Sequence, residues 1–183
     1  MKKFLKWTAI IVGSLAVILF VFAKVMKSRT KKASPEVTAE YKKNGKDISV
    51  FYCSPSKKGR VIFDSLVPYG KAWRTGANEA TTFTTGTELN IGGKALPAGK
   101  YTLWTIPEKN EWTVILNSKQ YDWGVKNFQG DASREPEADV LQVKVPVQTL
   151  EAPQEQFSIT FPDSDSLMMV LAWDKVKVAV PIK

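Results

Sequence analysis

The chain is organised around residues 58–81, which read KGRVIFDSLVPYGKAWRTGANEAT. The apolar run 61–63 predicts a short β-strand, and the glycines that follow it allow the backbone to turn. Trp73 and Arg74 are neighbours in sequence between two of these glycines. Because a guanidinium near large apolar groups needs a polar partner, this segment is either a tightly packed corner or the wall of a site.

Before and after this stretch, apolar residues alternate with polar ones at the two-residue period of half-buried β-strands. We expect strands at 48–52, 89–91, 94–96, 101–106, 112–116, 141–147, 157–161, 167–173 and 176–182. Gly92 and Gly93 predict a hairpin turn between the second and the third of them. Short strands separated by turn residues are typical of an all-β, antiparallel β-sandwich, which is the fold that we expect.

One long apolar segment lies near the N-terminus. Trp7–Ala23 carries no charge and is long enough to span a bilayer, and Lys6 and Lys24 can reach toward the headgroups. A cleaved signal peptide is the alternative, but its apolar region normally has only about 7 to 15 residues. We therefore expect one retained transmembrane helix in residues 1–27, a Lys-, Ser-, Thr- and Glu-rich stalk in 28–45, and the β-sandwich in 46–183.

The formal net charge of +8 belongs to the N-terminal segment. Residues 1–32 contain no acid and eight basic residues, Lys2, Lys3, Lys6, Lys24, Lys27, Arg29, Lys31 and Lys32. Of the 26 Lys and Arg, 18 remain, and they balance the 18 Asp and Glu. Binding to nucleic acid needs a basic face, so we expect no nucleic-acid partner.

Basic residues flank the apolar segment on both sides, so the positive-inside rule does not decide its orientation. N-terminal anchors commonly hold a domain outside the cytoplasm. We expect a single-pass membrane protein whose C-terminal domain is extracytoplasmic.

The composition excludes several kinds of catalytic and metal site. The chain has no His and one Cys, Cys53, which removes imidazole ligands, thiolate metal clusters and intramolecular disulfides. The acidic residues of 131–139 lack the alternation of a calcium loop, so we expect no metal and no cofactor. An enzyme would need two carboxylates at a defined separation, and no spacing singles out a pair, so a non-enzymatic role is favoured.

Residues 117–139 form a long polar segment that fits no strand and contains Trp123 and Phe128. Long loops inside compact domains are often functional. The alternative is that these two aromatic residues fold back as a lid over one end of the sandwich.

Short motifs run through the C-terminal part of the chain. They are Lys58-Gly59-Arg60, 66–81 (LVPYGKAWRTGANEAT), 96–103 (LPAGKYTL), Ile106-Pro107, 111–115 (EWTVI) and Trp123-Gly124. Together they resemble the bacterial family called domain of unknown function 2911, from about residue 47 to the C-terminus. The family has an Arg before the proline where this chain has Ser54. Its members commonly carry a secretory or lipoprotein leader, so the resemblance implies an extracytoplasmic domain and no particular activity.

The candidate ligand-binding residues are Trp73, Arg74, Asn78, Glu79, Trp104 and Trp123. The fork of Arg74, the amide of Asn78 and the carboxylate of Glu79 suit a sugar or a carboxylate ligand beside an aromatic platform. In the favoured structural alternative, Arg74 pairs with Glu79 and Asn78 caps the turn. Trp112 and Trp173 lie in predicted strands and are expected in the core.

These observations predict a membrane-anchored, extracytoplasmic β-sandwich that binds a ligand or partner, either a carbohydrate or a protein. One alternative is a carboxylate-based hydrolase that acts on envelope polysaccharide. Another is a structural component of the bacterial envelope.

Overall fold

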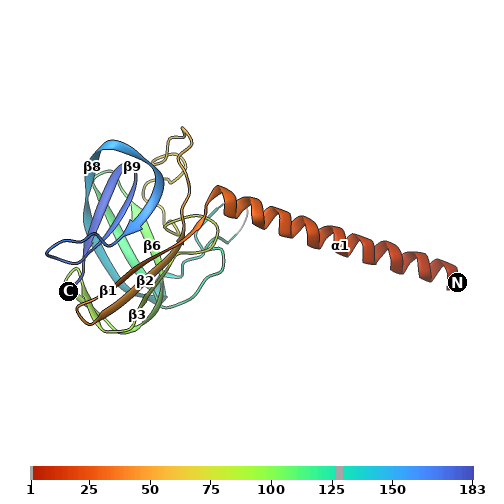
Figure 1. Ribbon diagram of the computed structural model, residues 1–183, viewed down its shortest axis with the longest axis horizontal. Helices are drawn as coiled ribbons and strands as arrows, with labels where there is room; N and C mark the ends of the chain where they lie inside the picture. Colours follow the sequence, from red (N-terminus) through yellow and green to blue (C-terminus); the bar gives the residue numbers. More distant parts are fainter. Residues whose placement is uncertain (1, 127–129) are drawn as a thin grey trace. The chain divides into compact units, whose positions relative to one another are not determined.

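The computed structural model describes residues 2–126 and 130–183 (Figure 1). The chain divides into two units, Met1–Ala33 and Ser34–Lys183. The first is a single helix, α1 (Lys2–Ala33), in which Phe4–Ala33 is long and apolar enough to cross a membrane, by length and composition. The second consists mostly of antiparallel strands. The expected fold class, an antiparallel β domain that follows an N-terminal apolar helix, is confirmed.

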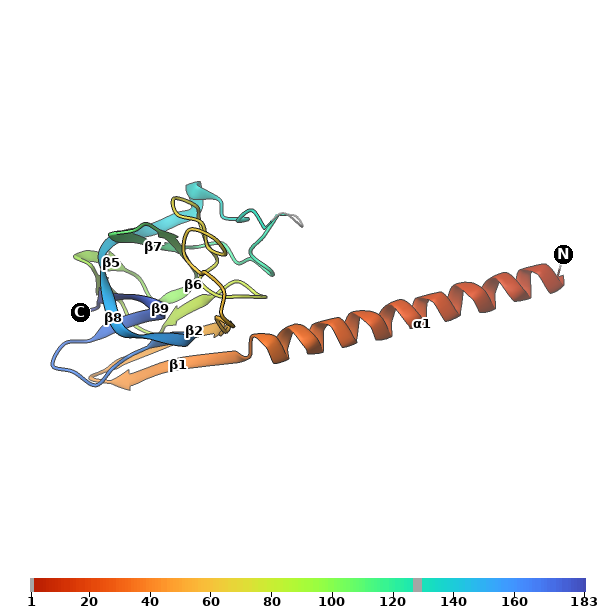
Figure 2. The same cartoon turned by 90° about the horizontal axis from the view of Figure 1, so that it is seen from above.

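Seven strands form one curled antiparallel sheet. In order across the sheet they are β1 (Glu36–Lys43), β2 (Lys46–Cys53), β3 (Thr82–Thr85), β6 (Gly99–Pro107), β7 (Glu111–Asn117), β8 (Asp139–Thr160) and β9 (Met168–Pro181). The expected hairpin is formed by β4 (Leu89–Ile91) and β5 (Lys94–Leu96), and a 3₁₀ turn, η1 (Pro136–Ala138), precedes β8. Figure 2 shows β8 bending from beside β7 toward β2, so that the sheet encloses the core.

The boundary of the folded unit differs from the one expected. Residues 36–43, placed in a stalk by the sequence, form β1, which pairs with β2 along its whole length. Val37, Ala39 and Tyr41 alternate along β1 and pack against the core. The folded unit therefore begins at Ser34, immediately after α1, and not at residue 46.

The two sides of the curled sheet meet at a seam, which we define as residues 54–57, continuing from β2, and residues 155–159 of β8. The Phe157 amide donates to the Pro55 carbonyl at 2.9 Å, and the Lys57 amide donates to the Glu155 carbonyl at 2.7 Å. Lys57 also forms an ion pair with Asp174 of β9, with 2.5 Å between Nζ and Oδ1. This short stretch of pairing joins the start of the domain to its end.

Two side chains extend the seam beyond these backbone bonds. The Ser54 hydroxyl donates to the Phe157 carbonyl at 2.7 Å. The Tyr52 hydroxyl accepts from the Ile159 amide at 3.0 Å. Tyr52 and Ser54 are both buried, so these hydroxyls satisfy backbone groups that water does not reach.

An aromatic cluster fills the inside of the sheet. Trp73 stacks on Trp173, with ring centroids 6.0 Å apart and an interplanar angle of 16°. Trp112 and Phe157 meet Trp73 edge-on, at 6.2 and 5.0 Å. Trp112 and Trp173 are each 1% exposed, which confirms their predicted place in the core. Such pairs contribute about 0.5–1.5 kcal/mol each beyond the burial of their area.

Some predicted strands were wrong in detail. Residues 61–63 form no strand: Ile62 and Phe63 are buried, but the chain folds back so that Phe63 bridges to Val67. The segments expected at 141–147 and 157–161 belong to one strand, β8, and those at 167–173 and 176–182 fall largely within β9. Their pairing shifts register between Thr149 and Ser158, where β8 bends.

We predict that a fragment beginning at Ser34 is more stable than one beginning at Lys46. Loss of β1 removes the buried area of Val37, Ala39 and Tyr41, for which about 2 to 4 kcal/mol of unfolding free energy is expected. Urea unfolding followed by tryptophan fluorescence measures the difference. Equal midpoints and slopes would show that β1 contributes nothing to the fold.

We also predict that Tyr52→Phe destabilises the domain by about 1–3 kcal/mol, because the buried Ile159 amide loses its acceptor. Tyr41→Phe is the matched control, since its hydroxyl accepts from the exposed Asn44 amide, at 3.4 Å. Burial also raises the pKa of Tyr52. The folded state therefore favours the neutral phenol. The domain keeps its full stability below pH ~10 and loses part of it as the pH rises further and the phenol of the unfolded chain ionises. The alkaline loss of stability should therefore be smaller in Tyr52→Phe, and an unchanged alkaline profile would contradict the role of this hydroxyl.

Candidate functional site

The loop Trp73–Thr81 is held against β6 by backbone and threonine hydrogen bonds. The Trp73 amide donates to the Thr105 carbonyl at 2.7 Å, and the Thr105 amide donates back at 3.0 Å. The Thr75 and Thr105 hydroxyls are 3.1 Å apart, and the Thr81 hydroxyl donates to the Thr75 carbonyl at 2.8 Å. All three threonines are fully buried. The hydroxyls of these three threonines bond within the loop and between the loop and β6, and none of the three is exposed to a ligand.

The same loop is interlocked with residues 122–124. Arg74 Nη1 donates to the Trp123 carbonyl at 3.1 Å, and the Ala80 amide donates to the Asp122 carbonyl at 3.0 Å. Gly124 has a φ of +69°, and a Cβ there would lie 3.0 Å from the Arg74 Cβ. Two motifs far apart in sequence, 73–81 and 122–124, therefore form a single packed corner.

The half-buried guanidinium of Arg74 lies in an electrostatically mixed environment. Burial lowers its pKa, and the nearby Cys53 and Glu79 act in the opposite direction. The ion pairs of the described residues do not include one between Arg74 and Glu79. The Cys53 thiol donates to the Glu79 carboxylate at 3.4 Å. Arg74 and Glu79 thus attract each other at a distance, and each also has a contact elsewhere in the corner.

The other candidate residues have different surroundings. Asn78 is buried, has a φ of +55°, and donates to the Ser34 carbonyl at 3.3 Å, which ties the loop to the first residue of the domain. Trp104 is fully buried and meets Tyr121 edge-on at 5.3 Å, so it offers no face to solvent. Trp123 is 45% exposed. Phe128, expected to fold back with Trp123, lies outside the described residues.

Trp73 borders an open groove of about 500 Å³. We call this the Trp73 groove and define it by Ser65, Leu66, Val67, Pro68, Lys71, Ala72, Trp73, Gly130, Asp131 and Ala132. Its lining combines apolar side chains with a hydroxyl, an ammonium and a carboxylate. Of the six predicted site residues, the groove includes Trp73 alone. Its other lining residues lie in the two segments that the sequence singled out, 58–81 and 117–139, but none of them was a candidate ligand-binding residue.

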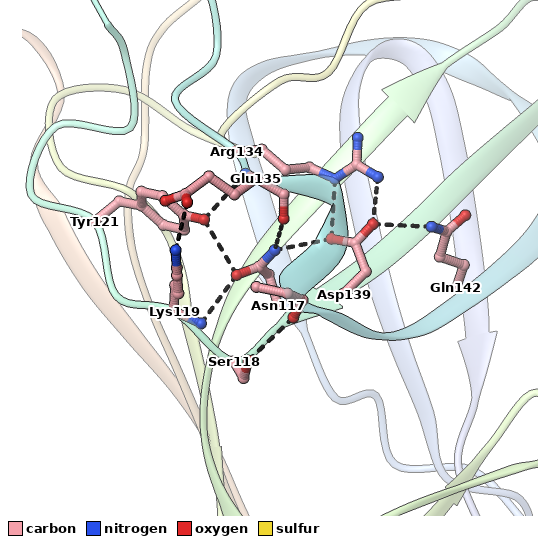
Figure 3. A network of polar contacts seen from close by, with 9 residues as sticks. Asn117, Ser118, Lys119, Tyr121, Arg134, Glu135, Asp139 and Gln142 are labelled. Carbon is pink, nitrogen blue, oxygen red and sulfur yellow. Dashed lines mark hydrogen bonds and ion pairs between the residues drawn. The ribbon is translucent and has the colours of Figure 1, made fainter.

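A buried polar network, also not predicted, joins residues 117–121 to residues 134–142 (Figure 3). Asn117 is fully buried, and its amide donates to the Glu135 carbonyl and to Asp139 Oδ1, both at 2.8 Å. Its oxygen accepts from the Lys119 amide at 2.9 Å and from the Tyr121 hydroxyl at 3.3 Å. The side chain of Asn117 thereby ties both ends of the segment 117–139 together.

Asp139 is the charged centre of this network. Arg134 donates to it through Nε, at 3.1 Å, and through Nη2, and the two side chains are 12% and 4% exposed. Gln142 donates to the same carboxylate at 2.9 Å. At the exposed side, the hydrogen bond from Lys119 lowers the pKa of Glu135. The sequence signal for this network is the cluster of charges at 131–139, which lacks the alternation of a calcium loop.

We predict that Gly124→Ala destabilises the domain by about 3 kcal/mol or more, since it adds a close contact to a left-handed backbone. Gly45→Ala is the matched control, because Gly45 has a similar φ of +73° and nothing within 4 Å of an added Cβ. It should cost only about 1 kcal/mol. Thermal unfolding of both variants measures the difference, and equal losses would mean that the interlocked corner tolerates a methyl group.

A family of known proteins matches the chain over almost the same residues as the folded unit. The family described as "Protein of unknown function (DUF2911)" matches residues 34–182, which is nearly the whole of the unit Ser34–Lys183. Neither a curated protein nor a solved structure matches the chain. The family resemblance of the sequence motifs is confirmed. The protein therefore belongs to the DUF2911 family.

Proposed function

We propose that this protein is a single-pass membrane protein whose extracytoplasmic β domain binds a small saccharide in the Trp73 groove. Residues 1–27 serve as the retained anchor, and the length and apolar composition of α1 support this role. The observation that carries the binding role is the groove itself, because concave sites with an aromatic wall and a few polar groups are the usual form of small-ligand sites.

The walls of the groove are held in place by bonds that do not depend on a ligand. Trp73 is fixed by its aromatic neighbours and by its indole N–H, which donates to the Gly76 carbonyl at 3.1 Å. On the same side, the Asp64 amide donates to the Val67 carbonyl at 3.0 Å. In the other lining segment, the Lys126 amide donates to the Asp131 carbonyl at 2.9 Å. A preformed groove costs little ordering entropy on binding.

The lining supports a neutral saccharide as ligand. The exposed Lys71 and Asp131 carry opposite charges, so the groove has no net charge. Leu66 and Pro68 provide apolar surface beside Trp73, and a sugar ring offers both an apolar face and hydroxyls. Asp131 is the one carboxylate among the described residues that line the groove, whereas a carboxylate-based hydrolase needs two. This favours binding over hydrolysis.

We predict that the fragment 34–183 binds triacetylchitotriose or maltotriose, the neutral probes chosen here. The measurement is a ¹⁵N NMR titration, in which saturable shifts should appear at 65–73 and 130–132. Lys71→Ala combined with Asp131→Ala removes two polar contacts of about 0.5–1.5 kcal/mol each, so affinity should fall roughly tenfold.

The matched control is Lys43→Ala combined with Asp163→Ala, which removes an exposed pair of the same charges outside the groove. This variant should bind as the original fragment does. Shifts that map elsewhere, or equal losses in both double variants, would contradict the assignment of the groove. The absence of shifts with either saccharide would contradict saccharide binding.

A further inference from the structure

The basic residues of α1 form a strongly charged region beyond its apolar segment. Five of the last ten residues of the helix are basic, namely Lys24, Lys27, Arg29, Lys31 and Lys32. Residues 1–33 contain no acid, and the rest of the chain is formally neutral. The charges are therefore concentrated beside the membrane and not spread over the folded domain.

The helical conformation sets the depth of these charges. Lys24 marks the end of the apolar segment, and its ammonium turns back over the ring of Phe20, at 5.4 Å from the centroid. At a helical rise of 1.5 Å per residue, Lys32 lies about 12 Å further along the axis than Lys24. The interfacial layer on each side of a bilayer is about 5–7 Å thick, and the Debye length at physiological salt is about 8 Å. All five charges thus fall within the electrostatic reach of lipid headgroups.

A purely local role explains only part of this pattern. Lys31 and Lys32 lie in the last turn, where basic side chains stabilise the carbonyl end of a helix. Lys24, Lys27 and Arg29 lie further back, where the effect of the helix dipole has fallen off. The helix dipole therefore does not account for these three charges.

We propose that Lys24, Lys27, Arg29 and Lys32 bind the headgroup phosphates of anionic phospholipids in the leaflet from which the domain emerges. This inference rests on the proposed membrane anchor and is independent of ligand binding in the Trp73 groove. Clusters of four to eight Lys and Arg next to a transmembrane helix are the usual means by which proteins attract anionic lipid.

The test uses the full chain reconstituted in vesicles of phosphatidylcholine and phosphatidylglycerol. Spin-labelled forms of each lipid report, by electron paramagnetic resonance, how much of it is immobilised at the protein. The intact chain should prefer phosphatidylglycerol by about threefold, and added salt should reduce the preference. The variant Lys24→Gln, Lys27→Gln, Arg29→Gln, Lys32→Gln should bring the ratio close to one.

The control variant carries the same loss of charge on exposed residues of the domain, Lys58→Gln, Lys100→Gln, Lys109→Gln and Lys175→Gln. It should keep the lipid preference. A preference that survives in the α1 variant, or that disappears equally in the control, would overturn the proposal.

Extraction of the same vesicles with alkaline carbonate separates this inference from the anchor on which it rests. Release of the chain by carbonate would refute the anchor. Retention of the chain without any lipid preference would leave the anchor intact and refute the lipid site alone.

Discussion

A sheet that curls on itself must pair the strands that meet, because unpaired backbone groups inside a protein are costly and exposed edges invite association. Here that requirement is met by the seam, where residues 54–57 pair with 155–159. Two buried hydroxyls, of Tyr52 and Ser54, satisfy groups that the backbone bonds do not reach. The aromatic cluster around Trp73 packs on the inner side of this closure, so the core and the groove beside it both depend on the seam.

The parts of the fold that the sequence predicted are those with a local signal. The period-two pattern identified β2 and the first half of β8, and a glycine pair identified the hairpin of β4 and β5. β1 was missed because charged residues outnumber its three core-facing ones, although these alternate as in any strand. The bend that joins two predicted segments into β8 depends on partners far away in sequence, and no local pattern shows it.

The candidate site shows the same difference between local signals, which the sequence contains, and contacts between residues far apart in sequence, which it does not show. The segment 58–81 was interpreted as a packed corner or a site wall, and the two interpretations were hard to separate because it has features of both. Its threonines, Arg74 and Asn78 hold residues 73–81 together, while Trp73 and residues before it border the groove. The groove residues 130–132 come from a loop that the bond between Arg134 and Asp139 ties to the start of β8. Such a tertiary contact cannot be seen in composition or spacing.

The seam also determines when the chain can fold during its synthesis. Tyr52 and Ile159 are separated by 107 residues in sequence, and β8 is itself paired with the last strand, β9. Contacts of such long range form slowly, because the chain must first lose the conformational entropy of closing a large loop. The sheet therefore stays open until nearly the whole chain has been made.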